Sequence, residues 1–340
     1  MAKTALIVGG SGQIGRATAT ALTADGWLVV CAQRNPPAHG QANPAVEHIA
    51  FDRDQPGALA RAVARGVDAL IDTVAYDERH ARQLLEVEAD VGALVVISSA
   101  SVYRDAAGRS LDEARETGFP RFPAAIDEDQ PTVAPGPQTY STRKVALEQT
   151  LLQNSRRPVA ILRPGAIHGE GSGHCREWFF VRRILDGRRV VPLAYGGESL
   201  FHTSATINVA ALITMVLETP VTAVLHAADP AALTVTQIGE AIARVYSYDW
   251  RLIPMPGPPT GGVGGSPWAV PHPIVLSTDR AVALGYRPRA TYEDAVGAAC
   301  RSAQALAAAG AAFSDYLLKL FDYASEDGYL SARSQALGDA

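Results

Sequence analysis

The feature that most constrains this fold is a short apolar run, which ends in glycines and leads directly into a helical pattern. The sequence IVGGSGQIG places Gly9, Gly12 and Gly15 after an expected strand and in the first turn of an expected helix. Glycines allow the backbone to approach a ligand closely, and the first N–H groups of a helix are unpaired. We therefore expect a pyrophosphate to bind against Gly9, Gly12, Gln13, Ile14 and Gly15. The alternative is a tight turn that binds no phosphate. The turn is not followed by Gly-Lys-Ser/Thr, the motif that would indicate a nucleotide triphosphatase.

Short apolar runs alternate with helical patterns through the first half of the chain. Six runs have the continuous apolar character of strands buried on both faces, namely TALIVGG, WLVVCAQ, VEHIAFD, DALIDTVA, GALVVISS and RPVAILRPG. Helical stretches such as QIGRATATALTADG separate them and end at glycines. This alternation predicts an α/β fold, a Rossmann-type, doubly wound parallel sheet with a smaller C-terminal substrate-binding subdomain.

Two segments interrupt this alternation of strands and helices. Residues 104–138 form a long polar connection, and residues 254–273 are rich in Gly and Pro, which indicates a mobile loop or lid. We expect a dinucleotide-binding domain over residues 1–170, with a return segment near 200–230. Residues 171–199 and 231–340 would then form the substrate-binding subdomain. The tail after residue 311 has amphipathic helical spacing and suggests no function.

Composition narrows the functional class. The 340 residues are 47% hydrophobic with a formal net charge of −5, which is typical of a globular protein and argues against a nucleic-acid partner. No apolar run is long enough to span a membrane, and the N-terminal run is too short for a signal segment. Three scattered cysteines, Cys31, Cys175 and Cys300, fit a reducing compartment. We expect a cytoplasmic protein.

The end of the second expected strand bears on the choice of cofactor. An NAD site usually has a carboxylate there for the ribose hydroxyls, whereas this strand ends in Gln33 and Arg34. A guanidinium binds a 2′-phosphate well, so NADP is favoured over NAD, the alternative being a surface arginine. Asp52 ends the third strand, where it would contact the adenine amino group or cap a helix. Further expected cofactor contacts come from residues at the ends of later strands, Val74, Ala75 and Arg163.

Three residues further along the chain form an expected catalytic set. Ser99 falls at the carboxyl end of the fifth strand, the edge that faces the ligand crevice in an open parallel sheet. Tyr140 and Lys144, in YSTRK, lie one helical turn apart. A nearby ammonium and an oxidised nicotinamide would lower the pKa of the phenol, which is near 10 in free Tyr. Ser99 would bind the substrate oxygen while Tyr140 exchanges its proton.

The ordered set of motifs resembles the extended short-chain dehydrogenase/reductase family, of the NAD(P)-dependent epimerase/dehydratase type. The matching segments are GGSGQIG, SSASVY, YSTRKVALEQ, LRPGAIHGEG and, more loosely, FHTSATINVAAL and LTVTQIGEAI, which span most of residues 1–245. The resemblance implies a catalytic triad of Ser99, Tyr140 and Lys144, with Lys144 also holding the nicotinamide ribose. It also suggests a homodimer through helices near 78–91 and 140–154, although a monomer is an alternative.

Departures from the family pattern bear on the substrate. Nucleotide-sugar members usually carry Asn where this chain has Ala166, Arg where it has Phe201, and Asp where it has Asn208. Without that amide and guanidinium a diphosphate is poorly neutralised, which argues against a nucleotide sugar. Dehydratases of the family carry an Asp-Glu pair after the catalytic hydroxyl, whereas Ala100 and Ser101 follow Ser99 here.

The expected substrate contacts are Ser101, His168, Trp178 and Phe201, although His168 and Trp178 have the alternative of packing inside the protein. Glu128 is either a further contact or a solvated loop carboxylate. The spacing of the histidines and Cys175 fits no common zinc pattern, so we expect no metal.

The sequence thus predicts an NADP(H)-dependent carbonyl reductase or alcohol dehydrogenase of small molecules. The alternatives are a sugar epimerase without net redox and a non-catalytic cofactor sensor.

Overall fold

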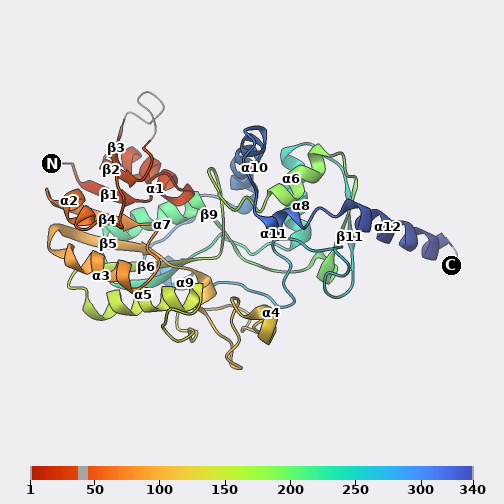
Figure 1. Ribbon diagram of the computed structural model, residues 1–340, viewed down its shortest axis with the longest axis horizontal. Helices are drawn as coiled ribbons and strands as arrows, with labels where there is room; N and C mark the ends of the chain where they lie inside the picture. Colours follow the sequence, from red (N-terminus) through yellow and green to blue (C-terminus); the bar gives the residue numbers. More distant parts are fainter. Residues whose placement is uncertain (1, 37–44, 339–340) are drawn as a thin grey trace. The chain divides into compact units, whose positions relative to one another are not determined.

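The computed structural model describes residues 2–36 and 45–338, and these form two compact units (Figure 1). The first unit comprises Met1–Gly165, Thr206–Ala228 and Leu276–Arg289, and the second comprises Ala166–Ala205, Asp229–Val275 and Ala290–Ala340. Residues 276–289, which the sequence placed in the smaller subdomain, cluster with the first unit. They are held there by contacts of α9 with β10 and by a hydrogen bond from the Tyr286 hydroxyl to the carbonyl of Asn208.

A seven-stranded parallel sheet organises the first unit. Its order is β10-β6-β5-β4-β1-β2-β3, which confirms the doubly wound α/β fold. The strands are β1 (Thr4–Val8), β2 (Leu28–Gln33), β3 (Val46–Ala50), β4 (Val67–Asp72), β5 (Val91–Ile97), β6 (Val159–Pro164) and β10 (Ala223–Ala227). Almost every residue of β1, β4, β5 and β6 is buried, as the continuous apolar runs require.

Helices cover both faces of this sheet. On one face α1 packs against α7, and on the other α3 packs against α5 (Figure 1). The helices of this unit are α1 (Gln13–Ala24), α2 (Ala58–Val63), α3 (Glu78–Glu86), α4 (Ala114–Thr117), α5 (Tyr140–Asn154), α7 (Thr206–Glu218) and α9 (Asp279–Ala283), with 3-10 turns η1 (Glu88–Asp90) and η2 (Ala100–Val102).

Strand register sets the place of the expected site. Val8 of β1 pairs with Ala32 of β2 on one side and with Asp72 of β4 on the other. The strand order reverses between β1 and β4, so the glycine turn and the end of β4 meet at the position where open α/β sheets bind ligands.

The second unit is built from short strands and helices around its own core. Its strands form two parallel pairs, β7 with β9 and β8 with β11. The elements are β7 (Ala166–His168), α6 (Trp178–Leu185), β8 (Val190–Leu193), η3 (Ala194–Gly197), β9 (Thr203–Ala205), α8 (Val235–Val245), β11 (Arg251–Pro254), α10 (Tyr292–Ala308), α11 (Asp315–Leu318) and α12 (Tyr323–Gly338). Aromatic residues of α6, with Trp268 and Tyr292, dominate the core.

Candidate active site

The glycine turn after β1 has the shape that a phosphate-binding loop needs. Gly9 has a φ of +87°, and a Cβ added to Gly15 would lie 2.4 Å from the carbonyl oxygen of Gly9. Helix α1 begins after Gly12 with no side chain capping its N–H groups and no acidic residue in its first turn. The turn therefore accepts only glycine at Gly15 and leaves the helix N-terminus open to an anion, so these residues fit a dinucleotide pyrophosphate.

The end of β2 carries the residues expected near the adenosine ribose. The Gln33 side chain is buried, with its Nε2 3.4 Å from Nδ1 of His48 and its Oε1 without a protein partner among the described residues. Arg34 follows it and is exposed. Asp52 lies just beyond β3 and accepts a hydrogen bond from the Asp54 N–H at 3.1 Å. Cofactor contacts by Gln33, Arg34 and Asp52 stay predictions.

Helix α5 positions Tyr140 and Lys144. A capping box fixes its start, in which the Thr139 hydroxyl accepts from the Thr142 N–H at 3.2 Å and the Thr142 hydroxyl accepts from the Thr139 N–H at 2.9 Å. One turn into the helix, the Lys144 ammonium is buried and donates to the carbonyls of Ala75, at 2.6 Å, and Ile97, at 2.8 Å.

Ser99 is brought to the same place by the end of β5. Its hydroxyl accepts from the Ser101 N–H at 3.1 Å and donates to the Ser101 hydroxyl at 3.0 Å, which caps turn η2. The Ser99 side chain also lies close enough to that of Tyr140 to favour its ionised form. The Ser141 hydroxyl donates to the Ser101 hydroxyl at 2.8 Å, which ties the turn to α5. The structure thus brings Ser99, Tyr140 and Lys144 together within the first unit.

The pKa values of this group differ from the sequence expectation. Burial raises the pKa of Tyr140 above its usual value, although the neighbouring Ser99 side chain opposes the change. Burial lowers the pKa of Lys144 to about 8, against the influence of Asp72 and Glu148. In the free protein the Lys144 ammonium is directed at two carbonyls and lies 5.7 Å from the centre of the Tyr140 ring.

A buried ion pair near Lys144 was missed by sequence reasoning. Arg53 contacts the fully buried Asp72 with both terminal nitrogens, at 2.9 and 3.2 Å. Asp72 also accepts from the Val74 N–H at 3.0 Å. The Thr73 hydroxyl donates to the carbonyl of Val8 at 3.0 Å. The pair therefore fixes the turn that carries Val74 and Ala75. A charged residue that ends an apolar strand, as Asp72 does, was the available signal.

Arg163 has a different place from the one expected. Its guanidinium is buried and donates to both carboxylate oxygens of Glu148, at 3.0 and 2.5 Å, and to the Tyr103 hydroxyl at 2.9 Å. These bonds join β6, α5 and the residue after η2, which indicates a structural role in place of the expected cofactor contact. Glu128 is likewise buried and accepts from the His226 N–H at 2.9 Å.

Three of the expected substrate contacts lie in the second unit. His168 is buried, with its Nε2 2.8 Å from the Asp229 carboxylate and its ring 4.6 Å from that of Tyr292. Trp178 stacks on Phe313 with ring centres 4.8 Å apart. Phe201 is half-buried and pairs with Ile274 through a backbone bridge. These contacts favour packing for His168 and Trp178, and substrate contacts by all three stay predictions.

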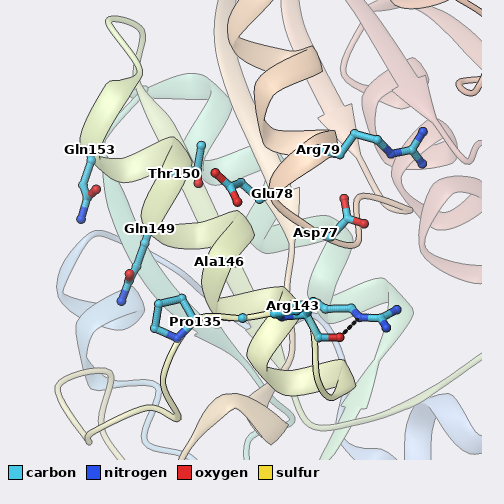
Figure 2. Close-up of a pocket in the computed structure, with 11 residues that line it drawn as sticks. Asp77, Glu78, Arg79, Pro135, Arg143, Ala146, Gln149, Thr150 and Gln153 are labelled. Carbon is cyan, nitrogen blue, oxygen red and sulfur yellow. Dashed lines mark hydrogen bonds between the residues drawn. The ribbon is translucent and has the colours of Figure 1, made fainter.

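A separate pocket of about 600 Å³ lies along α3 and α5 (Figure 2). It is lined by Asp77, Glu78, Arg79, Pro135, Gly136, Pro137, Arg143, Ala146, Gln149, Thr150 and Gln153. Arg143 donates to the carbonyl of Pro137 at 2.7 Å and lies over the ring of Tyr76. The pocket contains none of the expected catalytic residues. Its walls include helix surface that the expected homodimer would use, and that dimer stays a prediction.

Two further searches concern only the residues that the structure describes. No group of three or more metal-binding side chains is found among them. None of their helices is both long enough and apolar enough to cross a membrane.

The sheet order and the glycine turn are the features expected of a dinucleotide-binding fold. Residues 9–177 match the NAD(P)H-binding family model. This match and the parallel sheet support the NAD(P)-binding fold that the sequence motifs predicted.

Individual relatives differ in what their names describe. The chain is 28% identical over 318 residues to a 3-diazoavenalumate denitrifying reductase of a Streptomyces species, which covers 86% of this chain and 98% of that protein. A UDP-glucuronic acid 4-epimerase of Bacillus cereus has a TM-score of 0.65 at 15% identity and covers 89% of this chain and 99% of its own. A dTDP-glucose 4,6-dehydratase of Bacillus anthracis has a TM-score of 0.64 at 16% identity, with 89% and 97% covered. At these identities the two structures support the fold alone.

Proposed function

We propose that this chain is an NADPH-dependent reductase that acts on a small organic molecule through Ser99, Tyr140 and Lys144. One observation carries the proposal: Tyr140, whose side chain interacts with that of Ser99, lies one helical turn from a buried Lys144. Tyr140 is 40% exposed, so part of its side chain is open to a substrate, whereas Lys144 is buried.

Ser99, Tyr140 and Lys144 have different roles in the proposed reaction. When bound, NADPH would supply a hydride to a carbonyl carbon or to a carbon that bears a diazonium group, from which N₂ would leave with the electrons of the C–N bond. Ser99 donates a hydrogen bond to a carbonyl oxygen, and Tyr140 transfers its proton to that oxygen as negative charge develops there. Lys144 binds the nicotinamide ribose and supplies positive charge that offsets the phenolate.

Selectivity for NADPH rests on Arg34. The end of β2 presents no carboxylate that would repel a 2′-phosphate, and the exposed Arg34 offers a guanidinium there. Solved structures of similar fold contain NAD, so the preference of this chain is a separate question.

A second candidate reaction is reductive loss of nitrogen from the diazonium form of a diazo compound. It is supported by the full-length similarity to the Streptomyces reductase that is named for it. The two reactions differ in their need for a proton. Carbonyl reduction requires one from Tyr140, whereas replacement of N₂ by hydride forms only a C–H bond and requires none.

An epimerase is supported less well. The similar folds belong largely to nucleotide-sugar enzymes. However, Ala166 offers no amide to a diphosphate, and the buried Asn208 accepts from the Arg289 N–H at 2.8 Å. Its side chain is thus engaged within the first unit.

The test measures NADPH absorbance with panels of aldehydes, ketones and aryl diazonium acids, with NADH in parallel. Tyr140→Phe should reduce carbonyl turnover by roughly 10²- to 10⁴-fold and leave diazonium reduction nearly unchanged. Tyr246→Phe, which changes a hydroxyl near Gln304, is the matched control. Cofactor binding without consumption of NADPH on either panel would contradict the proposal and favour an epimerase or a cofactor sensor.

A further inference from the structure

The turn that joins β4 to α3 contacts the helix that carries Tyr140 and Lys144. The carbonyl of Ala75 in this turn accepts from the Lys144 ammonium at 2.6 Å. The next residue, Tyr76, packs its ring against that of Tyr140, with the ring centres 5.6 Å apart and the planes inclined by 50°. The Arg143 guanidinium lies over the ring of Tyr76, 5.5 Å from its centre. Two adjacent residues of one turn therefore contact three residues of α5.

Tyr76 is itself held in place from both sides. Its N–H donates to Nδ1 of the buried His80 at 2.9 Å, and the His80 N–H in turn donates to the Asp77 carboxylate at 3.1 Å, which caps α3. On the α5 side, Nε of Arg143 donates to the carbonyl of Pro137 at 2.7 Å. The cation over the Tyr76 ring is thus fixed as well, so the ring is a rigid neighbour for Tyr140.

The phenol of Tyr140 needs a neighbour of this kind. A helical side chain covers the turn that precedes its own residue, but Tyr140 is the first residue of α5 and has no such turn to pack on. Proton transfer requires heavy atoms about 2.6–3.2 Å apart, and a displacement of about 1 Å can cost about 10²-fold in rate. A tilted ring pair limits the rotation of each ring, so Tyr76 restricts the directions in which the phenol can point.

We infer that Tyr76 is a positioning residue, which holds the Tyr140 phenol where it can donate its proton to a substrate oxygen. The part played by the proton rests on the proposed reductase function, whereas the support of one ring by the other does not. Because replacement of N₂ by hydride uses no proton from Tyr140, Tyr76 should affect carbonyl reduction and not diazonium reduction.

The kinetic experiment compares Tyr76→Leu with Tyr76→Phe, which keeps the ring, in the full-length protein. With the aldehyde or ketone of the panel that is reduced fastest, Tyr76→Leu should lower kcat by roughly ten- to hundredfold and leave KM for NADPH within about twofold. Tyr76→Phe should recover most of the lost turnover. When Tyr140 is already Phe, adding Tyr76→Leu should cause no further loss, because the proton donor is absent.

A general disturbance of the turn would give a different pattern. It would displace the Ala75 carbonyl from Lys144, raise KM for NADPH and slow both reactions equally. That pattern, an additive loss in the double variant, or unchanged carbonyl turnover in Tyr76→Leu would overturn the inference. If Tyr76→Leu does not fold, Tyr76→Met, which fills more of the space without a ring, takes its place in each comparison.

NMR spectra of the protein with ¹³C-labelled tyrosine rings test the support of Tyr140 without turnover. The Tyr140 signals, identified by their loss in Tyr140→Phe, should be single and narrow in the unmodified protein and in Tyr76→Phe. In Tyr76→Leu they should broaden or divide as the ring samples several rotamers, and single narrow signals there would overturn the inference. Broadened signals together with no NADPH consumption on any panel would refute only the reductase.

Discussion

Lys144 should limit the activity of this enzyme at alkaline pH. Burial lowers its pKa to about 8, so roughly nine-tenths of the free protein carries the ammonium at pH 7 and about one-tenth at pH 9. The pKa of Tyr140 is raised, so its loss of a proton comes at higher pH. We expect kcat/KM for NADPH, which reports the free enzyme, to fall about tenfold for each pH unit above 8.

The fall in kcat/KM above pH 8 is the alkaline limb of the pH profile. Substitution of the two partners of the buried ion pair near Lys144 should shift this limb in opposite directions along the pH axis. Asp72 and Glu148 raise the pKa of Lys144, and Arg53 lowers it. At an effective dielectric constant of about 20, a unit charge at about 8 Å contributes about 2 kcal/mol, or about 1.5 pH units. Asp72→Asn should therefore move the limb to about pH 6.5, and Arg53→Gln should move it to about pH 9.5.

The assay is kcat/KM for NADPH as a function of pH, with thermal unfolding of each variant as a check that it is folded. Breaking a buried pair lowers stability by about 3–5 kcal/mol, but a general loss of structure would lower activity without moving the limb. Arg53→Lys, which keeps the charge, should leave the limb near that of the unmodified protein. Shifts of the same sign in Asp72→Asn and Arg53→Gln would refute the reasoning, as would an unmodified protein whose activity holds beyond pH 9.5.

Three further outcomes are expected. Gly15→Ala should abolish NADPH binding in a fluorescence titration, because the added Cβ meets the carbonyl of Gly9 at 2.4 Å; unchanged affinity would argue against the glycine turn as the phosphate site. Arg34→Glu should weaken NADPH binding by at least about tenfold and spare NADH, and an equal effect on both would place Arg34 outside the cofactor site. Glu148→Gln should lower the free energy of unfolding in urea by about 3–5 kcal/mol, because it leaves the guanidinium of Arg163 uncompensated, whereas a change under 1 kcal/mol would show the pair to be dispensable.

The strands of the first unit were predictable because burial on both faces leaves a continuous apolar run, as in the segment that becomes β5 (Val91–Ile97). The short strands of the second unit, such as β7 (Ala166–His168), carry no such run, since three residues show no period. The tail after residue 311 is helical, as its amphipathic spacing indicated, but it forms two separate helices, α11 and α12.

Spacing predicted the relative position of Tyr140 and Lys144 better than it predicted the ion pairs around them. Tyr140 and Lys144 are one turn apart on a helix, so their common face follows from sequence. The pairing of Arg53 with Asp72 spans 19 residues, and that of Arg163 with Glu148 spans 15. Neither separation matches the repeat of a helix or a strand, so only the order of the strands in the sheet brings the partners together. Arg163 was therefore assigned to the cofactor, although the chain uses it internally.

The state of Lys144 follows from these two pairs. Asp72 and Glu148 are the carboxylates that favour its ammonium, but each already has an arginine in contact, at 2.9 and 2.5 Å. Because the arginines compensate both anions, the third cation has no carboxylate of its own, and burial outweighs the remaining attraction. The result is an ammonium with a lowered pKa whose hydrogen bonds, among the described residues, go to two carbonyls at 2.6 and 2.8 Å, so that its charge is available to a ligand. A third buried carboxylate would make Lys144 more basic, but it would neutralise the charge that the proposed chemistry requires beside Tyr140.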